Sequence, residues 1–173
     1  MNRATDGKRM RPLVGAGLVL GIGLGGFVDG ILLHQILQWH NMLSSVTPPV
    51  DLVSMKYNMV WDGLFHALTW FTCAAGVALL FRAGRRPDAI WSGRLLVGSM
   101  LGGWGLFNLV EGLIDHQLLG IHHVHPGEAQ LAWDLGFVLA GGLGLMLLGF
   151  VVARRSPRAA PGRAGEQRTA QTR

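Results

Sequence analysis

Four long apolar stretches dominate the chain, at residues 13–38, 59–81, 95–119 and 131–153. Each is longer than the roughly 20 residues that an α-helix needs to cross the hydrocarbon core of a bilayer. The stretches carry almost no basic residues, and their acids and histidines sit away from the centre. The first stretch is too long for the apolar core of a signal peptide, and no convincing cleavage site follows it. The pattern predicts an all-α membrane protein with four transmembrane helices.

The basic residues lie almost entirely on one side of these helices. Only Lys56 lies on the other side, and the rest precede the first helix, connect the second and third, or follow the fourth: Arg3, Lys8, Arg9, Arg11, Arg82, Arg85, Arg86, Arg94, Arg154, Arg155, Arg158, Arg163, Arg168 and Arg173. Because loops rich in Lys and Arg stay in the cytosol, both termini are predicted to be cytoplasmic. Residues 1–153 then form the membrane domain, and residues 154–173 a disordered basic cytoplasmic tail.

This distribution changes the meaning of the overall composition. The net charge of +5 and the pI near 10.7 resemble those of a nucleic-acid-binding protein. Here the arginines act instead as topology signals and as contacts for anionic lipid, so nucleic acid is excluded as a partner. A single cysteine also excludes a disulfide scaffold. The opposite, outer half is acidic and carries all seven histidines, a setting that attracts cations.

An ungapped internal repeat links the first and third helices. Residues 29–40, DGILLHQILQWH, align with residues 111–122, EGLIDHQLLGIH, at a constant offset of 82 positions. The acid, the glycine, the first histidine, the glutamine and the final histidine recur in kind. Trp61-Asp62 and Trp133-Asp134 begin a weaker match between the second and fourth helices. We interpret the chain as two pseudo-repeated helical hairpins in the same orientation, as in parallel transporter repeats.

Ionisable residues accumulate in the outer halves of the predicted helices. An acidic side chain at mid-bilayer costs about 2.5–3.5 kcal/mol on insertion scales, so several of them are unlikely to persist without partners. Imidazole and carboxylate ligands together suit iron, manganese, zinc or oxidised copper. The predicted metal ligands are Asp29, His34, Asp62, His66, Glu111, Asp115, His116 and Asp134.

Helical geometry divides these residues into smaller groups. Asp62 and His66 are four positions apart, as are Glu111 and Asp115, so each pair shares one face of its helix. Asp29 and His34 are five positions apart, which separates them by about 140° unless the helix bulges locally. On a continuous helix His40 would lie ~16 Å along the axis from Asp29. A second, outer site is therefore predicted from His40, His122, His123 and His125.

Several alternatives remain open at this stage. The acids and histidines could form a structural hydrogen-bond network or a proton or ion relay. Haem could use two axial histidines, although it does not require so many carboxylates, and the sequence has no Cys-x-x-Cys-His motif. Copper(I) would prefer sulfur ligands such as Met42, Met55 and Met59.

Small residues recur every four positions in two of the helices. Gly17, Gly21 and Gly25 form one set, and Gly136, Ala140 and Gly144 form the other. Small side chains at this spacing let two membrane helices approach closely. Both sets are predicted to be helix-packing surfaces.

The repeated motifs resemble a family of bacterial multi-pass membrane proteins that is known only as a domain of unknown function. The likeness covers roughly residues 13–153 and is carried by residues 26–30, 34–40, 61–66, 111–112 and 122–124. It implies a location in the bacterial inner membrane and supplies no activity.

Two functional hypotheses therefore rest on the residues themselves. One is a metal-dependent membrane oxidase or hydroxylase with a membrane-soluble substrate. The other is a metal-handling or assembly protein that delivers an ion to a partner protein.

Overall fold

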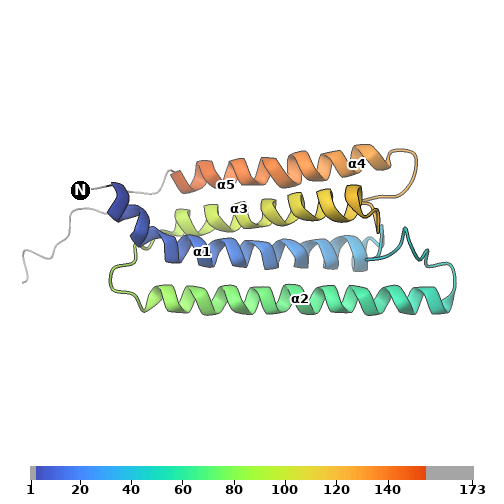
Figure 1. Cartoon of the computed structure of the whole chain (residues 1–173), viewed down its shortest axis with the longest axis horizontal. Coiled ribbons are helices and arrows are strands. Elements are labelled where there is room, and N and C mark those ends of the chain that lie inside the picture. Colours follow the sequence, from blue (N-terminus) through green and yellow to red (C-terminus); the bar gives the residue numbers. More distant parts are fainter. Residues whose placement is uncertain (1–2, 155–173) are drawn as a thin grey trace, which may run out of the picture.

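The computed structural model describes residues 3–154, which form four long helices (Figure 1). Three of the four helices contain a π-helical segment, and the elements in chain order are α1 (Arg3–Val28), η1 (Asp29–Ile36), α2 (Leu52–Gly84), α3 (Gly93–Glu111), η2 (Gly112–Leu118), α4 (Gln130–Gly136), η3 (Phe137–Gly144) and α5 (Leu145–Arg154). All four helices are long and apolar enough to cross a membrane. The prediction of an all-α protein with four candidate spans is confirmed.

The second helix begins earlier than its apolar stretch suggested, at Leu52 rather than at residue 59. Its first turn is held by Asp51, whose carboxylate accepts hydrogen bonds from the backbone N–H groups of Val53 and Ser54. The Ser54 side chain in turn accepts from the backbone N–H of Asp51, which completes a capping box. Capping extends the helix into polar sequence that hydropathy alone does not mark. Of the tail predicted at 154–173, all but Arg154 lies outside the described residues.

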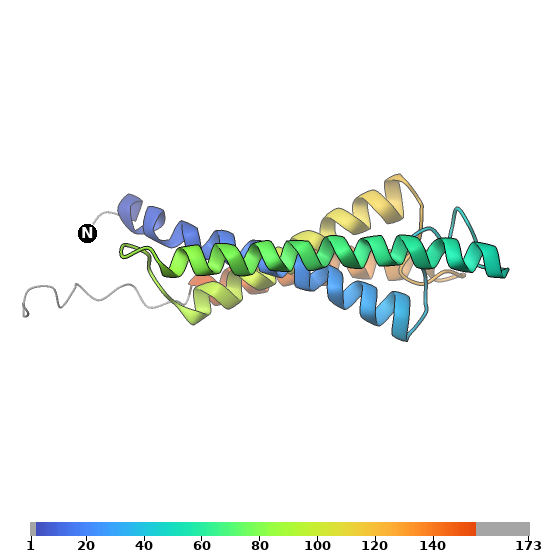
Figure 2. The same ribbon diagram turned by 90° about the horizontal axis from the view of Figure 1, so that it is seen from below.

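The four helices lie in a row, in the order α2, α1, α3 and then α4–α5 (Figure 1). The two central helices cross each other, so that α1 and α3 diverge on either side of the crossing (Figure 2). The described chain begins and ends at one end of the row, together with the loop between α2 and α3. We call this the arginine end, with Arg9, Arg11, Arg82, Arg85, Arg86, Arg94 and Arg154; the opposite end, which contains every histidine, is the histidine end.

Glycines make the close crossing of α1 and α3 possible. A Cβ atom at Gly21 would overlap the backbone of Met100, and one at Gly103 would overlap the backbone of Leu18. A Cβ at Gly17 would lie 2.6 Å from Cβ of Ser99, which is also too close. The predicted packing role of the glycine set in the first helix therefore agrees with these contacts.

The corresponding prediction for the fourth helix is wrong in its residues. A Cβ added at Gly136 would meet nothing within 4 Å, whereas one at Gly149 would lie too close to the backbone of Gly98 and Gly102. Gly136, Ala140 and Gly144 are all exposed, so the predicted set lies on the outward face of the helix. The glycines of this helix that pack on the backbone of α3 are Gly142 and Gly149.

The side chains show the polarity expected in a membrane. Large apolar side chains of α2 such as Leu68, Phe71 and Phe81 are exposed. The buried side chains of the same helix include Asn58 and Asp62. Since lipid accepts apolar groups and excludes charged ones, the outer surface fits a hydrocarbon environment and the ionisable groups are packed inside.

Candidate metal centre

The first helix ends in the π-helical segment η1, which changes the relation between Asp29 and His34. In this segment backbone bonds span five residues, as in Leu37 N–H to Leu32 O at 2.8 Å. Residues five apart therefore come to the same face, and His34 Nε2 lies 3.2 Å from Asp29 Oδ2. The expectation of a 140° separation, which assumed a regular α-helix, is wrong for this pair.

The third helix ends in the same way, in η2. Leu119 N–H bonds to Ile114 O at 2.7 Å, again across five residues. Glu111 and His116, which are also five apart, come together with His122 so that one ligand atom from each lies within 4.8 Å of the others. Both acid–histidine pairs of the repeat thus meet through π-helical geometry.

Beyond each π segment the chain turns back instead of continuing outward. The turn uses a left-handed residue in both cases, Gln38 at φ 51° and Gly120 at φ 57°. As a result the ring centroid of His40 lies 4.5 Å from that of His34. The estimate of ~16 Å between Asp29 and His40 along one axis does not hold, because the helix ends at Ile36.

His40 and His122 lie side by side at the centre of the site. Each one donates its Nδ1–H to a backbone carbonyl, His40 to Val124 at 2.8 Å and His122 to Met42 at 3.0 Å. A carbonyl can only accept, so the proton sits on Nδ1 and the lone pair sits on Nε2. Burial, reinforced by neighbouring imidazoles, lowers the pKa of His40 to about 4 and that of His122 to about 3. Both rings are therefore neutral near pH 7, the form in which imidazole binds metals.

Asp62 lies behind His34. Its carboxylate accepts from His34 Nδ1 at 2.9 Å, from Asn41 Nδ2 at 2.8 Å and from the backbone N–H of Met42 at 2.8 Å. With its oxygens occupied in this way, Asp62 orients the His34 ring and leaves Nε2 facing the centre. A carboxylate that holds the far nitrogen of a histidine is a common support for metal-binding histidines.

Asp134 has the equivalent position in the second hairpin. It accepts from His123 Nδ1 at 2.7 Å and from the backbone N–H of Val124 at 3.0 Å. Gln117 Nε2 donates to it at 3.2 Å, and His116 Nδ1 lies 3.5 Å away. Asp62 and Asp134, both predicted as direct ligands, are thus hydrogen bonded to histidines and to the backbone N–H groups of Met42 and Val124.

Unpartnered polar atoms are concentrated at the centre of the site. Eight buried side-chain atoms without a hydrogen-bond partner come from six residues, which we call the central cluster: Asp29, His34, His40, Glu111, His116 and His122. In the part of the chain that the structure describes, only one other such atom is found, on Asp6. Each cluster residue is at most 5% exposed. A buried polar group without a partner costs about 1–3 kcal/mol, so this concentration requires an explanation.

The donor atoms are close enough to share a cation. His34, His40 and His122 form one group of three, and Glu111, His116 and His122 form another, each with ligand atoms within 4.8 Å of one another. Ligands bound at about 2.0–2.2 Å from an ion lie up to roughly 4 Å apart, so small adjustments would complete either set.

The other predicted residues lie around the cluster. His66 donates its Nδ1–H to the carbonyl of Asp62 at 2.7 Å and packs on Gly30, where a Cβ would come within 2.8 Å of its Nε2. Asp115 is half-buried and belongs to neither group of three. The ring of His125 packs against those of Trp39 and Trp133, at 5.0 and 5.8 Å. The predicted outer site is thus divided, because His40 and His122 turn inward while His123 and His125 do not.

Sequence reasoning gave no role to Gln35, Asn41 and Gln117. Gln35 Nε2 lies 3.5 Å from Asp62, and Gln117 makes the matching contact with Asp134. The glutamine repeats at the same offset as the acid and the histidines, and this repetition was the available signal. Asn41 has no such signal, because its counterpart in the second hairpin is His123.

No curated protein and no solved structure shows significant similarity to this chain. A family model described as a predicted membrane protein (DUF2243) matches residues 16–156, which include part of α1, the other three helices and the whole central cluster. The chain belongs to this family of predicted membrane proteins.

Proposed function

We propose that the protein is a membrane metalloprotein whose central cluster binds one or two transition-metal ions. The observation that carries the proposal is the convergence of eight buried, unpartnered nitrogen and oxygen atoms. In His40 and His122 the other ring nitrogen is already hydrogen bonded, so that the free Nε2 faces the cluster, and in His34 the second nitrogen faces Asp29 Oδ2 at 3.2 Å. This combination of a held ring and a free lone pair is what a metal site requires.

The ligand set indicates the class of metal. Four imidazoles and two carboxylates favour iron, manganese, zinc or oxidised copper over soft copper(I). Asp29 and Glu111 face each other inside the buried cluster, where two carboxylates cannot both stay ionised unless a cation lies between them. A bound dication removes that restriction and supplies the partners that the buried atoms lack.

Haem fits the cluster less well. A haem with two axial histidines holds them on opposite faces of a flat macrocycle. The histidines here are packed against one another instead, with the His40 and His122 ring centroids 4.7 Å apart and the rings almost parallel. Three donors surround a common point in each group, which suits an ion.

The burial of the cluster favours a resident metal over a carried one. A carrier must release its ion readily, whereas each ligand here is at most 5% exposed. A cavity of about 280 Å³ adjoins the site and is lined by His34, Gln35, Gln38, Asn41, Pro49, Met55, Met59 and Asp62. We therefore favour a metal-dependent oxidase or hydroxylase with a membrane-soluble substrate over a metal-handling protein. The metal, when bound, supplies Lewis acidity or oxygen activation.

Topology and ancestry belong to the same proposal. The positive-inside rule makes the arginine end cytoplasmic, in a bacterial inner membrane, and the metal site then lies near the periplasmic surface. The matched pairs His34–Asp62 and His116–Asp134 support descent of the two hairpins from one ancestor.

A one-residue shift in the fourth helix is consistent with that descent. Asp134 follows Asp62 by 72 positions. Farther along the same two helices, Gly149 follows Gly76 by 73 positions, and the two glycines make equivalent contacts: Gly76 packs on Leu20, and Gly149 packs on Gly102, which follows Leu20 by the offset of 82. The π segment η3 lies between these points and accommodates one inserted residue.

The decisive experiment is elemental analysis with an optical spectrum on protein purified in detergent. We expect a fixed metal stoichiometry in the parent and its loss in a His40→Ala/His122→Ala variant. His125→Ala is the matched control, because this histidine packs against Trp39 and Trp133 outside the cluster. Circular dichroism and size-exclusion chromatography check that each variant folds. A Soret band would favour haem instead, and metal content unchanged in the double variant would overturn the ligand assignment.

Metal exchange separates the two functional hypotheses. A resident metal should remain bound during prolonged incubation with a chelator under native conditions. Rapid exchange with an isotopically labelled ion, at the same stoichiometry, would support the metal-handling alternative.

A further inference from the structure

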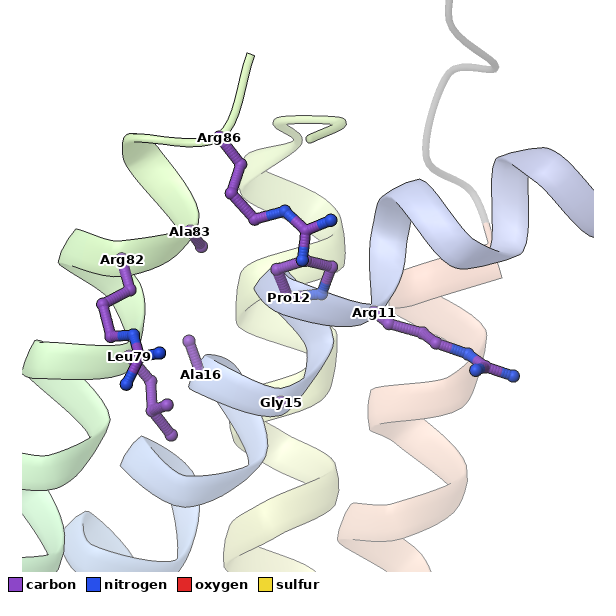
Figure 3. Close-up of a pocket in the computed structure, with 8 residues that line it drawn as sticks. All are labelled: Arg11, Pro12, Gly15, Ala16, Leu79, Arg82, Ala83 and Arg86. Carbon is purple, nitrogen blue, oxygen red and sulfur yellow. The ribbon is translucent and has the colours of Figure 1, made fainter. Parts of the chain in front are cut away.

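A second cavity lies at the arginine end, far from the histidines and between α1 and α2 (Figure 3). Its volume is about 530 Å³, and its lining consists of small or apolar residues and three arginines: Arg11, Pro12, Gly15, Ala16, Leu79, Arg82, Ala83 and Arg86. The metal site uses none of these residues.

The cavity exists because α1 bends and both helices carry small residues there. Figure 3 shows α1 changing direction at Arg11 and Pro12, as expected of a proline inside a helix. Ala16 and Ala83 are buried at the contact between the two helices. A Cβ built at Gly15 would meet nothing within 4 Å, so this glycine opens onto free space.

Positive charge is concentrated at the rim of the cavity. In Figure 3 the guanidinium of Arg86 extends over Pro12, and that of Arg82 lies beside Leu79, whereas Arg11 points away from both. No acidic residue lines the cavity. The nearest acid along the chain is Asp88, an exposed residue that pairs with Arg86 at 3.3 Å. The arginine side chains are exposed, so a ligand can reach them.

We propose that this cavity binds one anionic phospholipid, with the phosphate between Arg82 and Arg86 and the glycerol and upper acyl chain along Gly15, Ala16 and Leu79. The combination of a basic rim and an apolar wall requires a ligand that is anionic at one end and apolar at the other. A free phosphate would satisfy the arginines and leave the wall exposed. Basic pockets between membrane helices are known to bind lipid head groups in this way.

The position of the cavity agrees with this occupant. It lies where α2 ends its apolar span, at Gly84, so the rim is at the level of lipid head groups and the wall is at the level of acyl chains. Arginine is suited to the phosphate because its planar guanidinium can donate two parallel hydrogen bonds. Arg86 makes two such bonds with the exposed carboxylate of Asp88, both at 3.3 Å, and the phosphate would replace them.

The test measures lipid retention by the full chain. Protein purified in detergent is supplemented with phosphatidylglycerol or phosphatidylcholine, and bound lipid is counted by native mass spectrometry. We expect one phosphatidylglycerol per chain and little phosphatidylcholine. Replacement of both rim arginines, Arg82→Gln/Arg86→Gln, should weaken phosphatidylglycerol binding roughly five-fold for each charge removed. The matched control is Arg85→Gln/Arg154→Gln, which removes two charges from the same end but none from the cavity.

A second variant tests the apolar wall without changing the charge. Gly15→Leu should fill the cavity and prevent phosphatidylglycerol binding, since there is space for its side chain. Gly63→Leu is the control, because a Cβ there also meets nothing within 4 Å but lies outside the cavity. Circular dichroism and size-exclusion chromatography report whether each variant is folded.

Three results would overturn the proposal. One is equal loss of phosphatidylglycerol in the rim variant and in the Arg85/Arg154 control, which would indicate general electrostatics. Another is unchanged binding in Gly15→Leu. The last is displacement of phosphatidylglycerol by millimolar inorganic phosphate, which would identify a site for a soluble anion.

Discussion

His40 and His122 stack on each other with ring centroids 4.7 Å apart and an interplanar angle of 10°. Each donates its Nδ1–H to the carbonyl two residues beyond the other histidine, His40 to Val124 and His122 to Met42. The two loops therefore hold each other in place through a reciprocal pair of hydrogen bonds. Because both Nδ1 atoms are occupied, both Nε2 atoms remain available at the centre of the site.

Replacement of Asp62 by Asn should separate a supporting role from direct metal binding. Asp62 accepts three close hydrogen bonds, so Asp62→Asn should disturb the orientation of His34 and lower metal affinity by about 10–100-fold. Titration of the Asp62→Asn apoprotein with metal should still reach the stoichiometry of the parent at saturation. We expect the same result for Asp134→Asn. Asp51→Asn, at the exposed start of α2, is the control. Loss of stoichiometry at saturating metal would make Asp62 a direct ligand.

The two left-handed turns give a prediction about stability. A left-handed conformation costs a residue with a Cβ about 1 kcal/mol, and glycine avoids this cost. Gln38→Gly should therefore raise the free energy of unfolding, whereas Gly120→Gln should lower it by about 1 kcal/mol. A Cβ at Gly120 meets nothing within 4 Å, so no steric clash complicates the comparison. Thermal unfolding in detergent at saturating metal measures both. Equal effects of the same sign would contradict the backbone explanation.

The broad architecture could be predicted from the sequence because it depends on local properties. Helix length and hydropathy identified the four spans, and the repeat identified Asp29, His34, Glu111 and His116 as related pairs. These inferences need only the composition of a segment and its alignment with another. Burial of an acid within an apolar helix costs free energy anywhere in a membrane. The functional importance of such an acid can therefore also be inferred from its own segment.

The detailed arrangement of the site could not be predicted, because it depends on how segments meet. A π-helical end has no sequence marker, yet it alone brings Asp29 to His34. The turn at Gln38 uses a residue that rarely adopts positive φ, so nothing indicated that His40 would fold back. The proposed distinction between Asp62 as a support and His34 as a ligand depends on the backbone N–H of Met42, which no sequence pattern places.

The crossing of the central helices should be intolerant of larger residues. A side chain at Gly21 would overlap the backbone of Met100, so Gly21→Leu cannot be accommodated by rotation of a neighbouring side chain. Overpacking typically costs about 1–3 kcal/mol, and a backbone clash should reach at least the upper end of that range. Thermal unfolding in detergent should show a large loss for Gly21→Leu and little change for Gly63→Leu, which faces open space. Similar stabilities for the two variants would show that α1 and α3 do not approach each other as described.

The proposed topology has a direct test in living cells. A reporter that is active only in the cytosol, fused after Arg173, should be active. A reporter that is active only outside the cytoplasmic membrane, fused within the loop between Ile36 and Leu52, should also be active. The reverse pattern would place the metal site at the cytosolic surface and exclude the positive-inside assignment.

Replacement of Glu111 by Gln should affect stability mainly when metal is present. In the apoprotein two facing, buried carboxyl groups cannot both be ionised, so Glu111→Gln, which keeps a neutral polar group opposite Asp29, should change the melting temperature little. In the presence of saturating metal the same change removes a ligand from the Glu111, His116 and His122 group. A ligand that binds only the folded state stabilises it more when its affinity is higher. The metal-induced increase in melting temperature should therefore be smaller in the variant than in the parent. Parallel melts with excess chelator and with excess metal measure both effects. A variant whose melting temperature falls equally in both conditions would show that Glu111 is needed for packing rather than for binding a cation.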